Sequence, residues 1–145
     1  MEPRQSIEHL RNEHAEILRV TDKIEVALSL ASREEFTSRQ KGLAELRTLQ
    51  QGLIGISQHC GSEDCILESI YHHYLDGQRH ERICTQHLGI FRLIVSLRRE
   101  LPFFTADSVA EAIPQGEDLV ARIREHIAYE EEMLAYIENS RLQLQ

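Results

Sequence analysis

Residues 124–138, REHIAYEEEMLAYIE, carry the pattern that decides the fold. Apolar residues recur there at steps of three and four, which is typical of an amphipathic α-helix. His126 and Glu130 are four residues apart, so on a helix their side chains share one face and lie about 6 Å apart. An imidazole and a carboxylate at that separation can both reach one metal ion. His59 and Glu63 repeat the spacing.

Spacing alone does not identify a ligand pair, because His9 and Glu13 share it. The helix face that each pair occupies distinguishes a candidate ligand pair from a surface pair. A first helix is predicted from an N-cap at Ser6 to about Ala31, and His14 falls on its apolar seam. His9 and Glu13 each lie about 100° from that seam, so we expect a solvated surface pair. The seam positions of this helix are Ile7, Leu10, His14, Ile17, Thr21, Ile24 and Leu28.

The same periodicity predicts a second helix after a polar loop over residues 32–40. Ser32 and Glu35 fit a capping box at its start. Its seam positions are Leu46, Leu49, Leu53, Ile56, His59, Glu63, Ile66 or Leu67, and Ile70. Glycines in this helix either weaken it or permit another helix to approach closely, and both interpretations stay open. These glycines are Gly52, Gly55 and Gly61.

A third helix is predicted between the Asp-Gly turn at residues 76–77 and Pro102, which cannot continue a helix. Its seam positions are His80, Ile83, His87, Ile90, Ile94, Leu97 and Leu101. The connection over residues 102–118 is expected to contain a short helix that Ser108 caps and Pro114 stops.

The fourth helix is predicted from about Gln115 to Asn139. Its seam positions are Leu119, Ile123, His126, Glu130, Met133 and Ile137. Four amphipathic helices with mostly short connections predict an all-α, up-down-up-down four-helix bundle. We expect residues 1–145 to form a single domain.

Composition excludes several classes of protein. The formal net charge of −8 argues against nucleic-acid binding, which needs a basic surface. No apolar run has the length of a membrane span, and the first residues lack an apolar signal segment, so we expect a cytoplasmic protein without a membrane partner. The three cysteines match no zinc motif. We expect Cys60, Cys65 and Cys84 to be reduced core residues, with Cys60, beside His59, as a redox candidate.

Histidine and glutamate side chains are predicted to gather in one layer of this bundle. Counting from the turns at about 1.5 Å per residue brings the seam positions of the four helices to similar depths. The residues of this layer are His14, His59, Glu63, His87, His126 and Glu130. His80 lies roughly 10 Å along the axis from His87 and is expected in another layer. Titratable groups rarely face a core unless they are paired or bind metal.

Imidazole and carboxylate ligands suit iron, manganese or zinc. Two carboxylates can bridge two metal ions and leave two imidazoles for each. Ferritin-like bundles use Glu-x-x-His, which no seam here contains, and His80-Glu81 does not continue into a metalloprotease HExxH motif. The alternative is a metal-free polar network inside a plain helical bundle.

This combination resembles the hemerythrin-like, HHE cation-binding family. The matching stretches are EHAEI around His14, HCGSED from His59, QHLGIFRLI around His87 and HIAYEEEMLAYIE from His126, in the family order. The resemblance implies a non-haem di-iron centre. The histidines of the first two helices would hold one iron, and those of the last two helices the other.

The bridging ligands implied by the resemblance are Glu63, Glu130 and an oxo or hydroxo group. One departure matters, because oxygen-carrying hemerythrins have a fifth histidine four residues from the first one on the third helix. Here Ile83 and Phe91 stand four residues from His87. The chain therefore resembles a four-histidine subset of the family, for which reversible oxygen carriage is not expected.

The resemblance implies a protein that binds, senses or reacts with a small diatomic or peroxide: oxygen, nitric oxide or hydrogen peroxide. Two alternatives stay open. One is an enzyme of peroxide removal or iron–sulfur-cluster repair, and the other is a metal-free bundle that binds a protein partner. A sensor would also need a protein partner to read its change of shape. The residues expected to wall the site from bulk water are Ile56, Ile90, Phe91 and Ile123.

Overall fold

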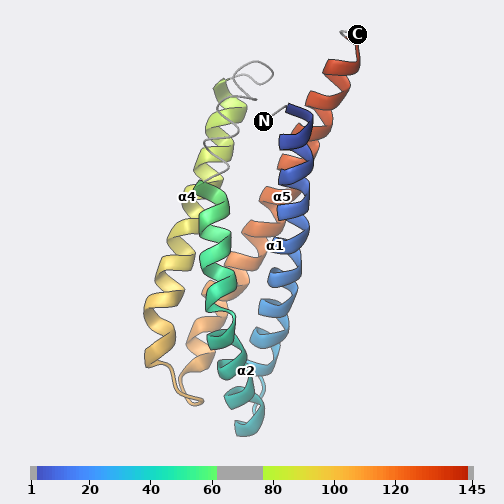
Figure 1. Cartoon of the computed structure of the whole chain (residues 1–145). Coiled ribbons are helices and arrows are strands. Elements are labelled where there is room, and N and C mark those ends of the chain that lie inside the picture. Colours follow the sequence, from blue (N-terminus) through green and yellow to red (C-terminus); the bar gives the residue numbers. More distant parts are fainter. Residues whose placement is uncertain (1–2, 62–76, 144–145) are drawn as a thin grey trace.

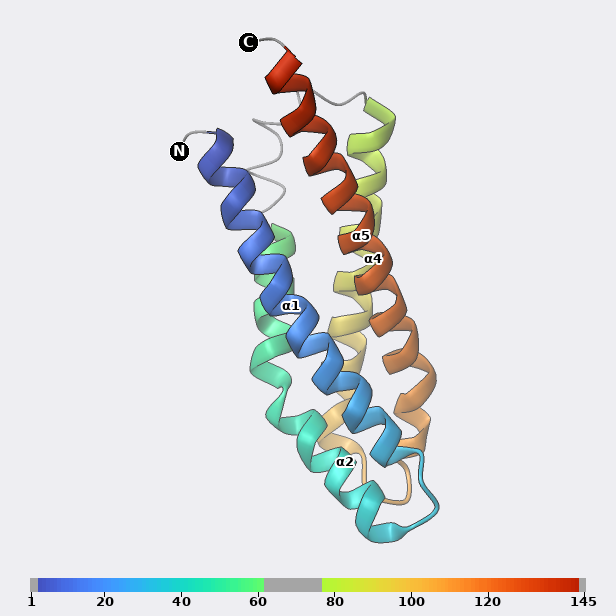
Figure 2. The same ribbon diagram turned by 90° about the vertical axis from the view of Figure 1, so that its right-hand side faces the viewer.

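The computed structural model describes residues 3–61 and 77–143, and all regular structure within these ranges is helical. The α-helices lie side by side in an elongated bundle, with α1 packed on α2 and α5, and α5 packed on α4 (Figures 1 and 2). The elements are α1 (Pro3–Ala31), α2 (Phe36–Thr48), a helical segment over residues 50–61, α4 (Gly77–Glu100), the short 3-10 helices η1 (Leu101–Phe103) and η2 (Val109–Ala112), and α5 (Ile113–Gln143).

The seam predicted for α1 is confirmed, because every one of its seven positions is buried. The predicted N-cap is wrong: α1 already begins at Pro3, and Ser6 is buried within its first turns. Proline suits a first helical position because its missing N–H needs no partner there. Thr21, a polar seam residue, donates its hydroxyl to the Ile17 carbonyl at 2.7 Å, so its burial leaves no donor unsatisfied.

The second predicted helix is broken at Leu49. α2 begins at Phe36, so the loop is shorter than predicted, and helix resumes at residue 50. The Leu49 N–H is shared between the carbonyls of Glu45 and Leu46, at 3.1 and 3.2 Å, as in a tightened last turn. The predicted capping box does not form, because Ser32 donates to the Ser29 carbonyl at the end of α1 instead.

The connection between α4 and α5 follows the prediction in part. α4 ends at Glu100, just before Pro102, and Ser108 is the N-cap residue of η2. Pro114 does not stop a helix, since it lies in the first turn of α5, where proline is tolerated. α5 runs to Gln143, beyond the predicted end.

Two apolar clusters make up the core. The larger one includes Ile17, Ile90 and Ile123, and the smaller one includes Leu10 and Ile83. Along α1, α4 and α5 the layer residues His14, His87 and Glu130 fall between described members of the two clusters, whereas on the segment 50–61 the described neighbours of His59 belong to the larger cluster alone. No helix among the described residues has the length and apolar composition that crossing a membrane requires.

Candidate metal centre

Five of the six predicted layer residues lie in the described part of the chain, and all five are buried. They are His14 (1% exposed), His59 (7%), His87 (3%), His126 (3%) and Glu130 (0%). α1 contributes the first, the helical segment 50–61 the second, α4 the third and α5 the last two. Glu63, the sixth, lies outside the described residues. Ionisable side chains are almost never buried this fully unless they are paired or bind metal.

His87 and His126 meet Glu130 at one of its carboxylate oxygens. Glu130 Oε2 lies 2.7 Å from His126 Nε2 and 3.9 Å from His87 Nε2. The two rings are edge to face, with their centroids 4.4 Å apart. One ligand atom from each of the three residues lies within 4.8 Å of the other two, close enough to hold one metal ion. The structure therefore shows a buried group with the donors of a metal site.

The other oxygen of Glu130 faces a second histidine pair. Oε1 lies 3.7 Å from His14 Nε2. The His14 ring meets the His59 ring edge to face, with centroids 5.2 Å apart. Glu130 thus lies between two pairs of imidazoles, with one oxygen toward a member of each pair.

Three of these histidines are oriented by polar side chains through Nδ1. His14 Nδ1 lies 2.8 Å from Glu131 Oε1, and His126 Nδ1 lies 2.7 Å from Gln86 Oε1. His59 Nδ1 contacts Glu13 Oε2. Carboxylate and amide oxygens accept, so each Nδ1 carries the proton, and the lone pair on Nε2 is available to a metal.

Sequence reasoning missed these outer partners, and the prediction for Glu13 was incomplete. Its ion pair with His9 forms at 3.1 Å, but the same carboxylate also contacts His59. A sequence signal was present: Glu13 directly precedes His14, Gln86 precedes His87, and Glu131 follows Glu130. A residue next to a ligand on a helix points about 100° away from it, where it can meet a ligand from the neighbouring helix.

One further observation supports a metal ion bound by these donors. Neither oxygen of Glu130 accepts a hydrogen bond of good geometry from the described residues, although His126 Nε2 lies 2.7 Å away. In the neutral imidazole with Nδ1 protonated, the lone pair of His126 Nε2 would face the carboxylate. A buried carboxylate in contact with a lone pair is unfavourable without a positive charge between them. A cation bound by both groups supplies that charge.

Other predicted residues lie outside this group. His80 is half-buried and is not part of the metal-ligand group, as expected from its place on α4. Ile56, Ile90 and Ile123 are buried, but Phe91 is 47% exposed and cannot wall the site. The reason is its place on α4: Phe91 directly follows the buried Ile90, so it points about 100° away from the core face. Three of the four predicted wall residues are therefore buried, and Phe91 is not.

Two of the three cysteines lie in the described part of the chain, and neither belongs to the metal-ligand group found there. Cys60 is buried, and Cys84 is half-buried. Tyr129, beside Glu130, packs under Arg82, whose guanidinium carbon lies 4.1 Å from the ring centroid. Cys65 lies outside the described residues.

No protein-family model, curated protein or solved structure matches this chain. Function is therefore argued from the chemistry of the site.

Proposed function

We propose that this chain is a hemerythrin-like, non-haem di-iron protein that binds, senses or reacts with oxygen, nitric oxide or peroxide. We further propose an up-down-up-down connectivity for its bundle, with residues 62–76 joining the second helix to α4. The support is chemical: four imidazoles and a carboxylate, all buried, converge from α1, the segment 50–61, α4 and α5.

The position of Glu130 carries the proposal of two metals rather than one. Oε2 faces His87 and His126, and Oε1 faces the pair made by His14 and His59. A carboxylate whose two oxygens face different imidazole pairs has the arrangement of a bridging ligand. Glu63 is proposed as the second bridge because of its spacing from His59.

The residues around the proposed centre would favour its reaction with small molecules. A pair of ferrous ions, when bound, supplies electrons to a small oxidant. The buried Ile56, Ile90 and Ile123 would restrict the access of bulk water and large substrates to the imidazole layer. Glu13 and Glu131 hold their histidines in one tautomer and orientation, which preserves the ligand geometry while the metal charge changes.

The direct test is the metal content of the chain after anaerobic reconstitution with ferrous iron. We expect about two iron ions per chain, because four imidazoles and two carboxylates make two sites. Parallel loading with manganese and zinc compares the affinities of the same donors. A chain that holds only trace metal after all three loadings would be a plain bundle, and the proposal would be wrong.

A further inference from the structure

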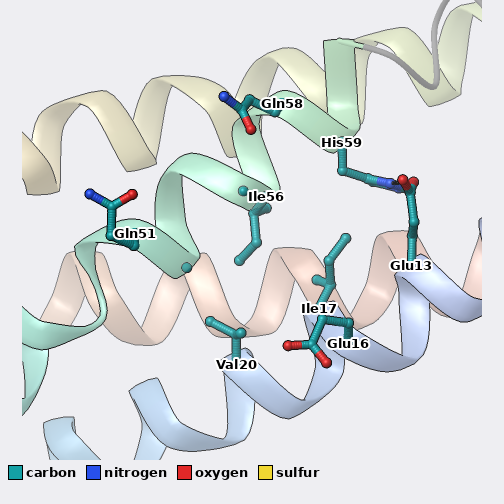
Figure 3. A pocket seen from close by; sticks show the side chains of 10 residues that line it. Glu13, Glu16, Ile17, Val20, Gln51, Ile56, Gln58 and His59 are labelled. Atoms are coloured by element: carbon teal, nitrogen blue, oxygen red, sulfur yellow. Dashed lines mark hydrogen bonds and ion pairs between the residues drawn. The ribbon is translucent and has the colours of Figure 1, made fainter.

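A cleft of about 530 Å³ lies between α1 and the helical segment 50–61 (Figure 3). Ile17, Val20 and Ile56 contribute its apolar lining, and Gly55 adds an open stretch of backbone. His59, one of the candidate ligands, also lines the cleft. The cleft therefore connects the surface of the protein to a side chain of the proposed centre.

Imidazole and carboxylate side chains contact one another in a series that runs from the surface to this cleft. His9, 48% exposed at its side chain, lies 3.1 Å from Glu13, which is 31% exposed. Glu13 in turn contacts His59, whose side chain is 6% exposed. Glu16, 58% exposed, adds a second carboxylate to the lining. In Figure 3 the side chains of Glu13 and His59 point toward each other from facing helices.

We propose that this cleft is the route by which a divalent cation reaches the centre, with Glu16 and Glu13 attracting it and His59 receiving it. The inference rests on the proposed function, since it assigns a loading route to the same site. Carboxylates on a partly enclosed surface concentrate cations and raise their association rate. A neutral oxidant gains nothing from two carboxylates, so the charge of the lining favours a cation as the occupant.

A second cleft, between α4 and α5, also carries two carboxylates. It is lined by Gln86, Asp118, Ala121, Arg122 and Glu125, and none of these is a candidate ligand. The Arg122 guanidinium there pairs with Asp118 at 3.1 Å. The cleft at Glu16 is the better route to the centre because it reaches a candidate ligand, His59.

Glu16 and its neighbour Arg19 allow a test of the charge. Glu13 also positions His59, so replacing it would change the site itself, whereas Glu16 contacts no candidate ligand in the described structure. Arg19 Nη2 lies 2.5 Å from Glu16 Oε1 and reduces the attraction for a cation. At low ionic strength, Glu16→Gln should slow uptake roughly two- to fivefold and Arg19→Gln should accelerate it, and both effects should fade in high salt.

Gly55 allows a test of the path that is independent of charge. A Cβ atom at Gly55 would meet no atom of the described residues within 4 Å, so Gly55→Leu should fold normally and place its side chain in the cleft. Gly77→Leu is the matched control, because Gly77 is equally open and lies at the start of α4, outside the cleft. We expect several-fold slower uptake for Gly55→Leu and the wild-type rate for Gly77→Leu.

The measurement mixes metal-free protein with Co²⁺ for timed intervals, removes unbound metal on a chelating resin, and counts bound cobalt by elemental analysis. All four variants should reach the wild-type content at long times. Wild-type rates in both Glu16→Gln and Gly55→Leu would overturn the loading route while leaving the metal centre intact. A Gly55→Leu chain that takes up cobalt normally, yet is oxidised slowly by oxygen after iron loading, would make the cleft an oxidant path instead. A wild-type chain that binds no metal would overturn both proposals.

Discussion

At the scale of single residues, Glu130 is the described carboxylate around which the histidines gather. It is fully buried, and imidazoles approach both of its oxygens. That His14, His87 and His126 are ligand candidates could be predicted from sequence, because a titratable residue is unusual on an otherwise apolar helix face. Gln86 and Glu131 stand next to predicted ligands in the sequence, but the histidines that they contact could not be predicted, since those contacts form only when the helices pack.

Replacement of Glu130 by Gln should remove the stabilisation that metal gives to the folded chain. Ligand at a hundredfold excess over its Kd stabilises a protein by about 3 kcal/mol, and Gln at this position offers a neutral amide in place of the bridging carboxylate. Glu132→Gln, at an exposed position two residues away, is the control and should keep the wild-type response. Thermal unfolding with and without metal measures the difference. Equal metal-dependent shifts in the two variants would exclude Glu130 as a ligand.

His87 and His80 allow a second comparison on one helix. His87→Ala should lose metal and metal-dependent stability together, because the binding energy is also folding energy. His80→Ala should retain the metal, since His80 is half-buried and stands apart from the ligand group. Elemental analysis after identical loading compares them. Loss of metal from the His80 variant alone would contradict the assignment of the α4 ligand.

At the scale of elements, the close approach of two backbones fixes where α2 packs on α1. Gly42 of α2 lies against the backbone of α1, where a Cβ atom would stand 2.6 Å from Ala31 N and 2.7 Å from Ala27 O. The sequence predicted both helices but not this contact, nor the break at Leu49. Both depend on how two helices meet, which the hydrophobic pattern of one helix does not specify.

Gly42→Ala and Gly55→Ala should therefore change stability in opposite directions. Alanine at position 42 clashes with backbone that cannot move aside and should destabilise the chain by about 1–3 kcal/mol. At position 55 the added methyl group meets nothing, so alanine should stabilise the helix by about 0.5–1 kcal/mol. Denaturant unfolding measures both free energies. Stabilisation by Gly42→Ala would show that the helices can separate at no cost.

Arg124 joins α5 to α1 through ion pairs with Glu25 and Asp22, at 2.6 and 2.9 Å. Its hydrogen bond and positive charge lower the pKa of Glu25 below the ordinary value of 4.5. A lowered carboxyl pKa stabilises the fold above pH 4.5, and the contribution is lost as the pH falls through the folded-state pKa. Because the pair is exposed, the effect should be small and screened by salt.

Arg124→Gln should return the pKa of Glu25 toward its ordinary value. An NMR titration of the Glu25 carboxyl in the wild type and the variant measures the change. Glu117→Gln, on the same helix, is the control and should leave the Glu25 titration as it is in the wild type. An unchanged pKa in Arg124→Gln would show that this ion pair does not persist in solution.

At the scale of the whole molecule, the described apolar residues form two clusters, and the histidine layer lies between them along α1, α4 and α5. The all-helical class and most seam positions follow from periodicity alone, because burial imposes the same pattern along every helix. The pairing of histidines around Glu130 does not follow from periodicity, since it depends on the distances between helices. The structure supplies those distances, and they place Glu130 between the two imidazole pairs.

The ligand set also predicts how the iron-loaded protein reacts. The chain lacks the fifth histidine that oxygen-carrying hemerythrins have on this helix. Ile83 and Phe91 occupy the two positions four residues from His87 on α4. Each metal would then keep room for a small ligand, and the reduced protein should oxidise rapidly and irreversibly in air. Stopped-flow absorbance after mixing with oxygen follows this reaction. An oxygenated species that reverts under vacuum would indicate an oxygen carrier.

The most direct test of the central claim, a metal pair bridged by Glu130, is the Mössbauer spectrum of protein reconstituted with the Mössbauer-active iron isotope and then oxidised. Two ferric ions that share a bridging ligand couple magnetically, so the account predicts a diamagnetic ground state for nearly all of the bound iron. A spectrum of isolated, paramagnetic ferric ions would contradict it, because each iron would then be bound without a shared bridge.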